Sequence, residues 1–496
     1  MLKKTASNHI ILIFISLIIF HFIPFERSSL APDDYSLMNI RNGFNNFIIH
    51  PDRPLLYIFL ETLYNILLEN ISLYFYLLII VNFLNLVVVY YLYKLFFNPT
   101  HSFLITIIYL VLYFKLEIYH NSIMIHISIV CSLYLLFLYM LINYINLNKI
   151  IYYYLSILFY FISIFWYEIG FFLPFVILFY YSGNKLFNLK NRFFILIPYF
   201  FLMIFYILLR QTSLFGFSQY ENSYQANFAF FSGSFDIFNH FFGRYAIKNI
   251  LYGIYQFLTF KISYVFFFVL FNLIFCFFIF ENYKFEKIKK NNLIFFIALF
   301  FLSILPILIN GESGGRNYII SSFSISLFIY LLFQFKKLNF KFVYILFIFI
   351  MFIVSQGNSI SQVIASRIQN EILISIKKNL NDINFKSIVF DPTSLTNNIN
   401  YSFFKTKYNL INTYYGAQVW EVWGIKGYVK NINNKKNIII VNETPSIQDD
   451  MIVLSEIQFI KNKEIKSNII KLLDKDIITL NYNNIYNLGF YYGKNE

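Results

Sequence analysis

Two adjacent carboxylates, Asp33 and Asp34, lie in the stretch LAPDDYSLMNIRNG, just after the first strongly apolar segment of the chain. A carboxylate within hydrogen-bond reach of a hydroxyl can accept its proton, and adjacent carboxylates raise one another's pKa toward a useful range. Pro-Asp-Asp also suits a solvated turn or a helix N-cap. The pair is therefore either an ordinary loop or the centre of a reaction beside an apolar segment.

The composition indicates what holds this pair in place. The 496 residues are 58% hydrophobic and only 13% charged, so a water-soluble fold could not bury the apolar surface. Repeated apolar runs of about 18 residues predict a multi-spanning helical membrane protein. Both cysteines, Cys131 and Cys276, fall inside predicted spans, so no disulfide framework is implied. We predict eleven spans, near residues 8–25, 72–97, 101–115, 122–143, 149–166, 169–182, 192–209, 262–281, 293–309, 318–335 and 341–356.

Charge placement predicts the orientation. With the N-terminus inside, the inner segments hold fourteen Lys or Arg against two Glu, whereas the short outer segments hold nine against eleven acidic residues. Cytoplasmic loops of membrane proteins are rich in Lys and Arg in this way. The net charge of +14 thus describes orientation in a cytoplasmic membrane rather than nucleic-acid binding. An odd number of spans places the tail after Gly357 outside.

Conspicuous polar residues gather on the predicted outer side. Asp33, Asp34, Arg53, Glu168, Arg210 and Arg316 all fall there, whereas the spans hold few ionisable groups beyond His126. An ion or proton transporter would normally carry charges at bilayer depth. Plainer interpretations stay open: an ion pair between Arg53 and Asp52 or contact with lipid head groups, an interface position for Glu168, a helix-end anchor for Arg210 and a simple turn at Arg316.

The stretch RPLLYIFLETLYNILLEN predicts a helix lying in the membrane surface, within the outer loop 26–71. Pro54 fits a first helical position, where its missing N–H costs nothing. Polar residues from Tyr57 to Glu69 recur at helical spacing, with leucines on the opposite face. A second helix of this kind is expected within residues 236–261.

At these motifs the chain resembles the polytopic GT-C glycosyltransferases, most closely bacterial members that modify O-antigen or other surface glycans, and more distantly protein O-mannosyltransferases. PDDYS and HPDRPLLY carry most of the similarity, and WYEIGFFLP and GGRNYIISS are similar to outer-loop motifs of the wider group. The resemblance covers about the first 360 residues in topology. It implies a catalytic membrane domain over residues 1–356 and an extracytoplasmic domain over residues 357–496.

The resemblance also implies a reaction. A sugar would pass from a polyprenyl-phosphate donor in the bilayer to a glycan or lipid-linked acceptor outside the membrane. It assigns Asp33 as the general base, with Asp34 orienting it, binding a divalent metal or exchanging roles. Arg316, followed by Arg53 and Arg210, is the candidate to stabilise the leaving phosphate, and Glu168 could bind sugar or acceptor hydroxyls. No organic cofactor is expected.

Two other functions remain open. An O-antigen polymerase or ligase would rely on outer-loop arginines, here Arg210 and Arg244. A flippase or transporter for lipid-linked sugars would need a polar path through the spans. Neither requires an acid after the first span.

The tail differs in composition from the spans. SIVFDPTSL, NIIIVNE and MIVLSEI predict strands, and residues 361–383 and 464–475 are expected to be helical, so the tail is predicted to be a small α+β domain. Its stretch YYGAQVWEVWGIKGY offers aromatic rings that could stack on sugars or form the domain core.

Overall fold

The computed structural model describes residues 2–21, 53–67, 70–113, 116–120, 124–180, 189–211, 234, 237–239, 241, 243–258, 268–274, 291–310, 318–334 and 342–360 of the helical part, and residues 387–390, 439–441, 446–448, 451–458, 466–473 and 477–480 of the tail.

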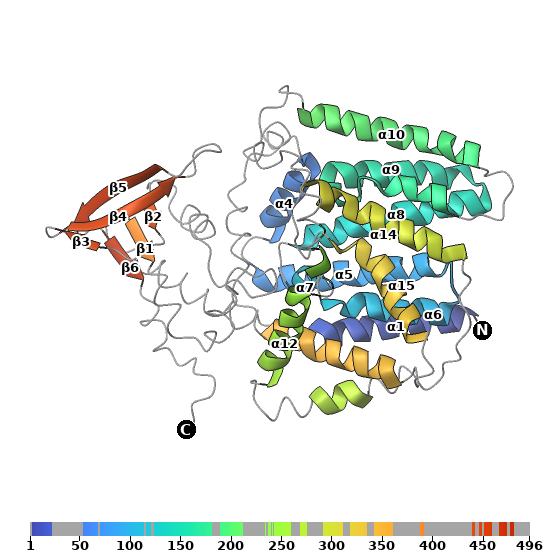
Figure 1. The fold of residues 1–496 in the computed structure, drawn as a ribbon, viewed down its shortest axis with the longest axis horizontal. Helices are drawn as coiled ribbons and strands as arrows, with labels where there is room; N and C mark the ends of the chain where they lie inside the picture. The colour runs from blue at the N-terminus through green and yellow to red at the C-terminus, as the bar shows by residue number, and fades with distance from the viewer. Residues whose placement is uncertain are drawn as a thin grey trace.

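The helical part is a bundle in which nine described helices lie side by side (Figure 1). These are α1 (Leu2–His21), α5 (Ile71–Tyr93), α6 (Pro99–Val111), α8 (Ile125–Leu147), α9 (Ile150–Trp166), α10 (Leu189–Gln211), α14 (Asn291–Asn310), α15 (Ser321–Gln334) and the helix Phe342–Ile360. Three further helices, α4 (Pro54–Leu67), α7 (Leu116–His120) and α12 (Arg244–Leu258), lie at the end of the bundle away from the N-terminus (Figure 1). We call this end the α4 end and the opposite one the N-terminal end.

Four described helices are long and apolar enough to cross a membrane: Ile71–Tyr93, Ile125–Leu147, Asn191–Leu209 and Phe342–Ile360. The fold is therefore predominantly helical, with four candidate membrane spans. Five further predicted spans, at 8–25, 101–115, 149–166, 293–309 and 318–335, coincide with shorter apolar helices. Only residues 268–274 of the predicted span at 262–281 are described, so the count of eleven stays a prediction.

The predicted sixth span is not an α-helix. After α9 the chain forms two 3₁₀ helices, η3 (Glu168–Gly170) and η4 (Leu173–Phe179), which we call together the return segment. Two tyrosine hydrogen bonds show the route of this segment. Tyr160 Oη of α9 donates to the Phe171 carbonyl (2.7 Å), and Tyr180 Oη, directly after η4, donates to Asn146 Oδ1 near the end of α8 (3.0 Å). The segment thus runs back along the bundle toward the N-terminal end.

Local sequence explains why this segment departs from the α-helix. Pro174 lies in the first turn of η4 and lacks an N–H for an α-helical bond. A Cβ on Gly170 would lie 2.6 Å from the Tyr134 ring, so only glycine allows the close approach of the segment to α8. Arg192 then donates to the carbonyls of Ile177 (3.4 Å) and Leu178 (3.2 Å), which joins α10 to the end of this segment.

Polar side chains join α5 to α8 inside the bundle. Ser128 Oγ donates to Asn82 Oδ1 (2.7 Å), and one turn further Asn85 Nδ2 donates to Ser132 Oγ (3.0 Å). Such interhelical bonds hold membrane helices together where lipid offers no competing partner. We call these two bonds the Asn–Ser ladder.

Ionisable groups inside the bundle are more numerous than His126 alone. His9 and His101 are also buried, and their Nδ1 atoms form hydrogen bonds with the hydroxyls of Tyr90 and Tyr330, respectively. Both histidines therefore have a structural partner.

The helix Phe342–Ile360 crosses α12 at a pair of glycines. A Cβ on Gly253 would lie 2.5 Å from the Val354 carbonyl oxygen, and a Cβ on Gly357 would collide with the Gly253 carbonyl. The two backbones thus touch directly, which small residues permit between packed helices.

Six strands are described in the tail. A parallel sheet has the order β2 (Ile439–Val441), β1 (Ser387–Phe390), β6 (Ile477–Leu480), and an antiparallel sheet the order β3 (Ser446–Gln448), β4 (Met451–Gln458), β5 (Lys466–Leu473). The three predicted strands coincide with β1, β2 and β4. The helix predicted at 464–475 is wrong, because this segment is β5 and pairs along its length with β4. Every described tail residue lies in a strand, so the α+β domain stays a prediction.

Candidate functional site

The N-terminal end of α4 places Arg53 at the α4 end of the bundle. Arg53 precedes Pro54, and its carbonyl accepts from the backbone N–H groups of Leu56 (3.1 Å) and Tyr57 (3.4 Å). The helix packs on α9 and α5 through a buried stripe that includes Leu56, Leu60 and Leu63. The apolar face and the start at Pro54 are confirmed, although Tyr57, predicted on the polar face, is buried as well.

Glu168 begins the return segment directly after α9. The α-helix ends at Trp166, and Tyr167 is extended, with φ −162° and ψ 126°. This extended residue turns the chain, so that Glu168 starts η3 and lies inside the protein, with 8% of its surface exposed. A buried carboxylate is costly unless it is paired and hydrogen-bonded.

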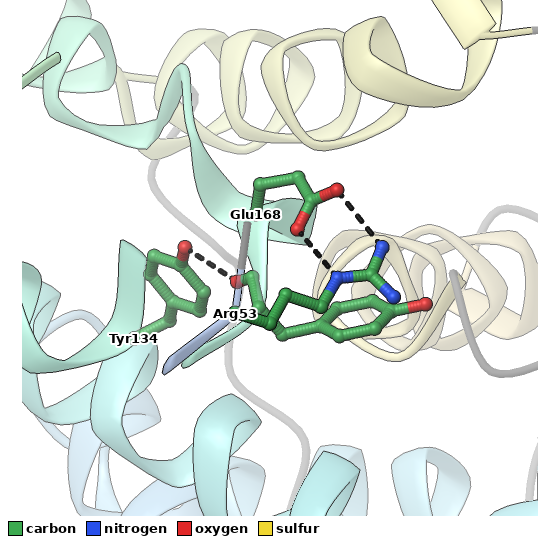
Figure 2. A network of polar contacts seen from close by, with 4 residues as sticks. Arg53, Tyr134 and Glu168 are labelled. Carbon is green, nitrogen blue, oxygen red and sulfur yellow. Dashed lines mark hydrogen bonds and ion pairs between the residues drawn. The ribbon is translucent and has the colours of Figure 1, made fainter. Parts of the chain in front are cut away.

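Arg53 provides that pairing through two parallel hydrogen bonds. Its Nε donates to Glu168 Oε2 (3.1 Å) and its Nη2 donates to Oε1 (2.9 Å). Figure 2 shows the Glu168 carboxylate turned toward the Arg53 guanidinium, with Tyr134 approaching from α8. A two-bond fork fixes the orientation of both planar groups, which one bond would not do.

Tyrosines hold the pair from the protein side. The Arg53 guanidinium carbon lies 4.2 Å from the centroid of the Tyr167 ring, a cation–π contact. Tyr134 Oη donates to the Tyr167 carbonyl (2.9 Å), so the backbone that carries both the ring and Glu168 is tied to α8. The orientation of Arg53 is therefore set by a carboxylate and an aromatic ring together.

Further aromatic groups surround this pair. The rings of Phe59 and Trp166 lie 4.9 Å apart between centroids, and His126 lies 6.2 Å from Tyr167. The Trp166 indole N–H is buried and has no hydrogen-bond partner among the described residues. An unused donor beside an aromatic platform is suited to a ligand oxygen.

Of the six predicted site residues, the structure brings together two. Arg53 and Glu168 were separate candidates, and their mutual pairing was not predicted. Arg210 lies in the last turn of α10, where only its backbone is described. Asp33, Asp34 and Arg316 lie outside the described residues, as does Asp52.

The site residues that sequence reasoning missed are Tyr167 and Tyr134. Tyr167 is adjacent to Glu168, but nothing in the sequence shows that its ring lies under an arginine. A signal that could have found the pair was the cost of burying charge. An Arg and a Glu beside apolar helices each lose hydration when they are buried alone, and this loss favours pairing between them.

Within the described ranges, no group of three or more His, Cys, Asp or Glu side chains is placed to hold a metal ion. The expected metal ligand, Asp34, lies outside these ranges. Comparison with models of known protein families and with curated proteins finds no match to this chain.

Proposed function

We propose that this chain is an integral membrane glycosyltransferase of GT-C type. It transfers a sugar from a polyprenyl-phosphate donor to a glycan or lipid-linked acceptor outside the cytoplasmic membrane. The observation that most supports this proposal is the forked Arg53–Glu168 pair at the α4 end, since a fixed guanidinium beside an interfacial helix suits a lipid-linked phosphate.

The proposed reaction uses acids and arginines in separate roles. The acceptor hydroxyl oxygen attacks the anomeric carbon, and its proton passes to Asp33, which Asp34 orients. The bond from the anomeric carbon to the phosphate oxygen breaks, and its electron pair leaves with the polyprenyl phosphate. Arginine donors stabilise the charge that the phosphate gains. Arg316, Arg53 and Arg210 are the candidates for this role, and the fork with Glu168 supports Arg53.

Glu168 acquires a more specific role in this proposal. Both of its carboxylate oxygens bind the Arg53 fork, so its first task is to position Arg53. The remaining lone pairs of these oxygens can still accept from a sugar hydroxyl, as the sequence resemblance implies.

Mass analysis of surface and lipid-linked glycans tests the proposal. Cells producing the full chain should carry a glycan heavier by one sugar residue than cells producing Asp33→Ala at equal membrane abundance. Unchanged transfer by Asp33→Ala would overturn the assignment of the general base.

The same experiment separates the alternatives. Loss of long glycan chains in Arg244→Ala, with Asp33→Ala active, would instead identify a polymerase or ligase. Movement of a lipid-linked sugar across the membrane with no new glycosidic bond would identify a flippase.

A further inference from the structure

Lys94 lies beside two aromatic rings at the N-terminal end of the bundle, remote from Arg53 and Glu168. We call Lys94 and the side chains around it the Lys94 site. It caps the C-terminus of α5, where its backbone N–H donates to the Tyr90 carbonyl (3.0 Å). Its ammonium nitrogen lies 5.1 Å from the Tyr91 ring centroid and 5.6 Å from that of Tyr90. Two aromatic faces therefore hold this cation in one position.

His9 of α1 contacts Tyr90 from the other side of the Lys94 site. Its Nδ1 lies 3.1 Å from the Tyr90 hydroxyl, and its ring stacks on Phe103 with centroids 5.0 Å apart. Tyr90 thus lies between the imidazole of His9 and the ammonium group of Lys94. The Lys94 site is therefore formed by residues of α1 and α5, with Phe103 of α6 packed behind His9.

The charge of Lys94 is not balanced by a carboxylate of the described bundle. The acidic residues of the described helices are Glu61, Glu117 and Glu168, which lie in α4, α7 and η3 at or toward the α4 end. The single ion pair found among the described residues is Arg53–Glu168. A negatively charged group from outside the described residues would therefore complement Lys94.

The same face of α5 continues from Lys94 as an exposed apolar stripe. Tyr91 and Val87 are half-buried, and Leu84, Ile80 and Tyr76 are each about half exposed, at 54–55%. These positions recur at helical spacing on one side of a helix long enough to cross a membrane. Ten residues from Lys94 to Leu84 rise about 15 Å, which is half the thickness of a bilayer core and so the depth of one leaflet.

The neighbouring helix borders this stripe with apolar side chains of its own. Ile11, Phe14 and Ile15 of α1 are exposed, and the Phe14 ring lies 5.0 Å from that of Phe83 on α5. An apolar surface one leaflet deep matches the length of an acyl chain, and the Lys94 ammonium at its end complements the negative charge of a lipid phosphate.

We propose that Lys94 binds the phosphate of an anionic phospholipid whose acyl chains lie along α1 and α5. The lipid comes from the leaflet at the N-terminal end, which charge placement predicts to be cytoplasmic. This site is independent of the proposed glycosyl transfer, since it lies at the other end of the bundle.

Native mass spectrometry of the full chain in detergent tests this site. Phosphatidylglycerol and phosphatidylcholine of equal chain length are added separately, and inorganic phosphate in a third arm. The wild type should retain phosphatidylglycerol selectively, and Lys94→Gln should weaken retention about fivefold, the factor expected for one lysine at an anionic surface. Lys94→Arg should retain the lipid, which separates loss of charge from loss of fold.

Lys149→Gln is the matched control. Lys149 is exposed at the turn between α8 and α9, at the same end of the bundle. Its substitution should leave retention unchanged. Equal retention by Lys94→Gln and wild type, an equal loss in Lys149→Gln, binding of phosphatidylcholine as tightly as phosphatidylglycerol, or binding of free phosphate in place of lipid would each overturn the proposal.

Discussion

Arg53 and Glu168 are 115 residues apart in the chain and are joined by two hydrogen bonds, of 3.1 and 2.9 Å. One residue precedes α4 and the other begins the return segment, so the pair fixes the start of both elements at the α4 end. Their side chains are only 18% and 11% exposed, which places both charges largely out of water. The pair therefore affects stability as well as any reaction nearby.

Substitution of one partner should destabilise the protein more than substitution of both. Glu168→Gln and Arg53→Gln each leave a charge without its partner, and we expect each to lower the free energy of unfolding by about 3 kcal/mol. Arg53→Gln combined with Glu168→Gln removes both charges and should cost clearly less than the sum of the two single substitutions. Thermal unfolding in detergent, analysed as a double-mutant cycle, measures this coupling.

Glu61→Gln provides the control, because Glu61 lies in α4, the helix that follows Arg53, and is only partly buried. It should change the free energy of unfolding by less than about 1 kcal/mol. Additive effects of the two single substitutions at Arg53 and Glu168 would contradict the pairing.

Single cysteines should report the predicted orientation. In a background with Cys131 and Cys276 replaced by Ser, Asn65→Cys on the exposed face of α4 should react with a membrane-impermeant maleimide added outside intact cells. Lys149→Cys, at the N-terminal end, should react only after the membrane is opened. The reverse labelling pattern would show that the chain is inverted.

Alanine at the glycine crossing should separate α12 from the helix Phe342–Ile360. We expect Gly357→Ala to cost about 1–3 kcal/mol, because its Cβ meets the rigid Gly253 backbone rather than a flexible side chain. Leu346→Ala, at an exposed position of the same helix, is the control and should have a smaller effect. Comparable unfolding temperatures for both variants would argue against the crossing.

Loss of the Arg192 side chain should loosen the return segment without unfolding the bundle. Arg192→Met removes the donors to the carbonyls of Ile177 and Leu178. Hydrogen–deuterium exchange should then rise in residues 173–180 and stay unchanged in α5, since local opening is read from individual segments. Exchange that rises equally everywhere would indicate global destabilisation instead.

The Asn–Ser ladder should contribute modestly. Ser128→Ala removes one hydrogen bond between α5 and α8, and Asn85→Leu removes one to α8 and a second from Tyr109 of α6 (3.2 Å). Bonds of this kind are worth about 0.6 kcal/mol each in membranes. Unfolding measured in the same detergent should show small effects, well below that of Glu168→Gln. A loss of more than about 2 kcal/mol from Ser128→Ala would mean that the ladder does more than join two helices.

Much of the helical part follows from local sequence. Long apolar windows predict the four candidate spans, and Arg-Pro followed by a periodic leucine stripe predicts α4 from its first residue. These features depend on neighbouring residues, whose spacing is visible in one segment. The presence of Arg53 and Glu168 among the site candidates also follows from charge placement alone.

The remaining features depend on contacts between distant segments. Residues 169–182 have the hydropathy of a span, but Pro174 and the contacts of Gly170 and Arg192 make this stretch a 3₁₀ return segment. KSNIIKLL reads equally as a short helix, and only its pairing with β4 makes it a strand. For the same reason the fork between Arg53 and Glu168 could not be located from sequence, because α9 and the extended Tyr167 determine where Glu168 turns.

The glycine crossing also has a mechanical consequence. Gly357 lies three residues before Ile360, the last described residue of its helix, and Gly253 lies in the middle of α12. Two backbones in direct contact have no side chains between them to absorb a displacement. A displacement of α12 at this crossing would therefore act directly on the last turn of the helix Phe342–Ile360.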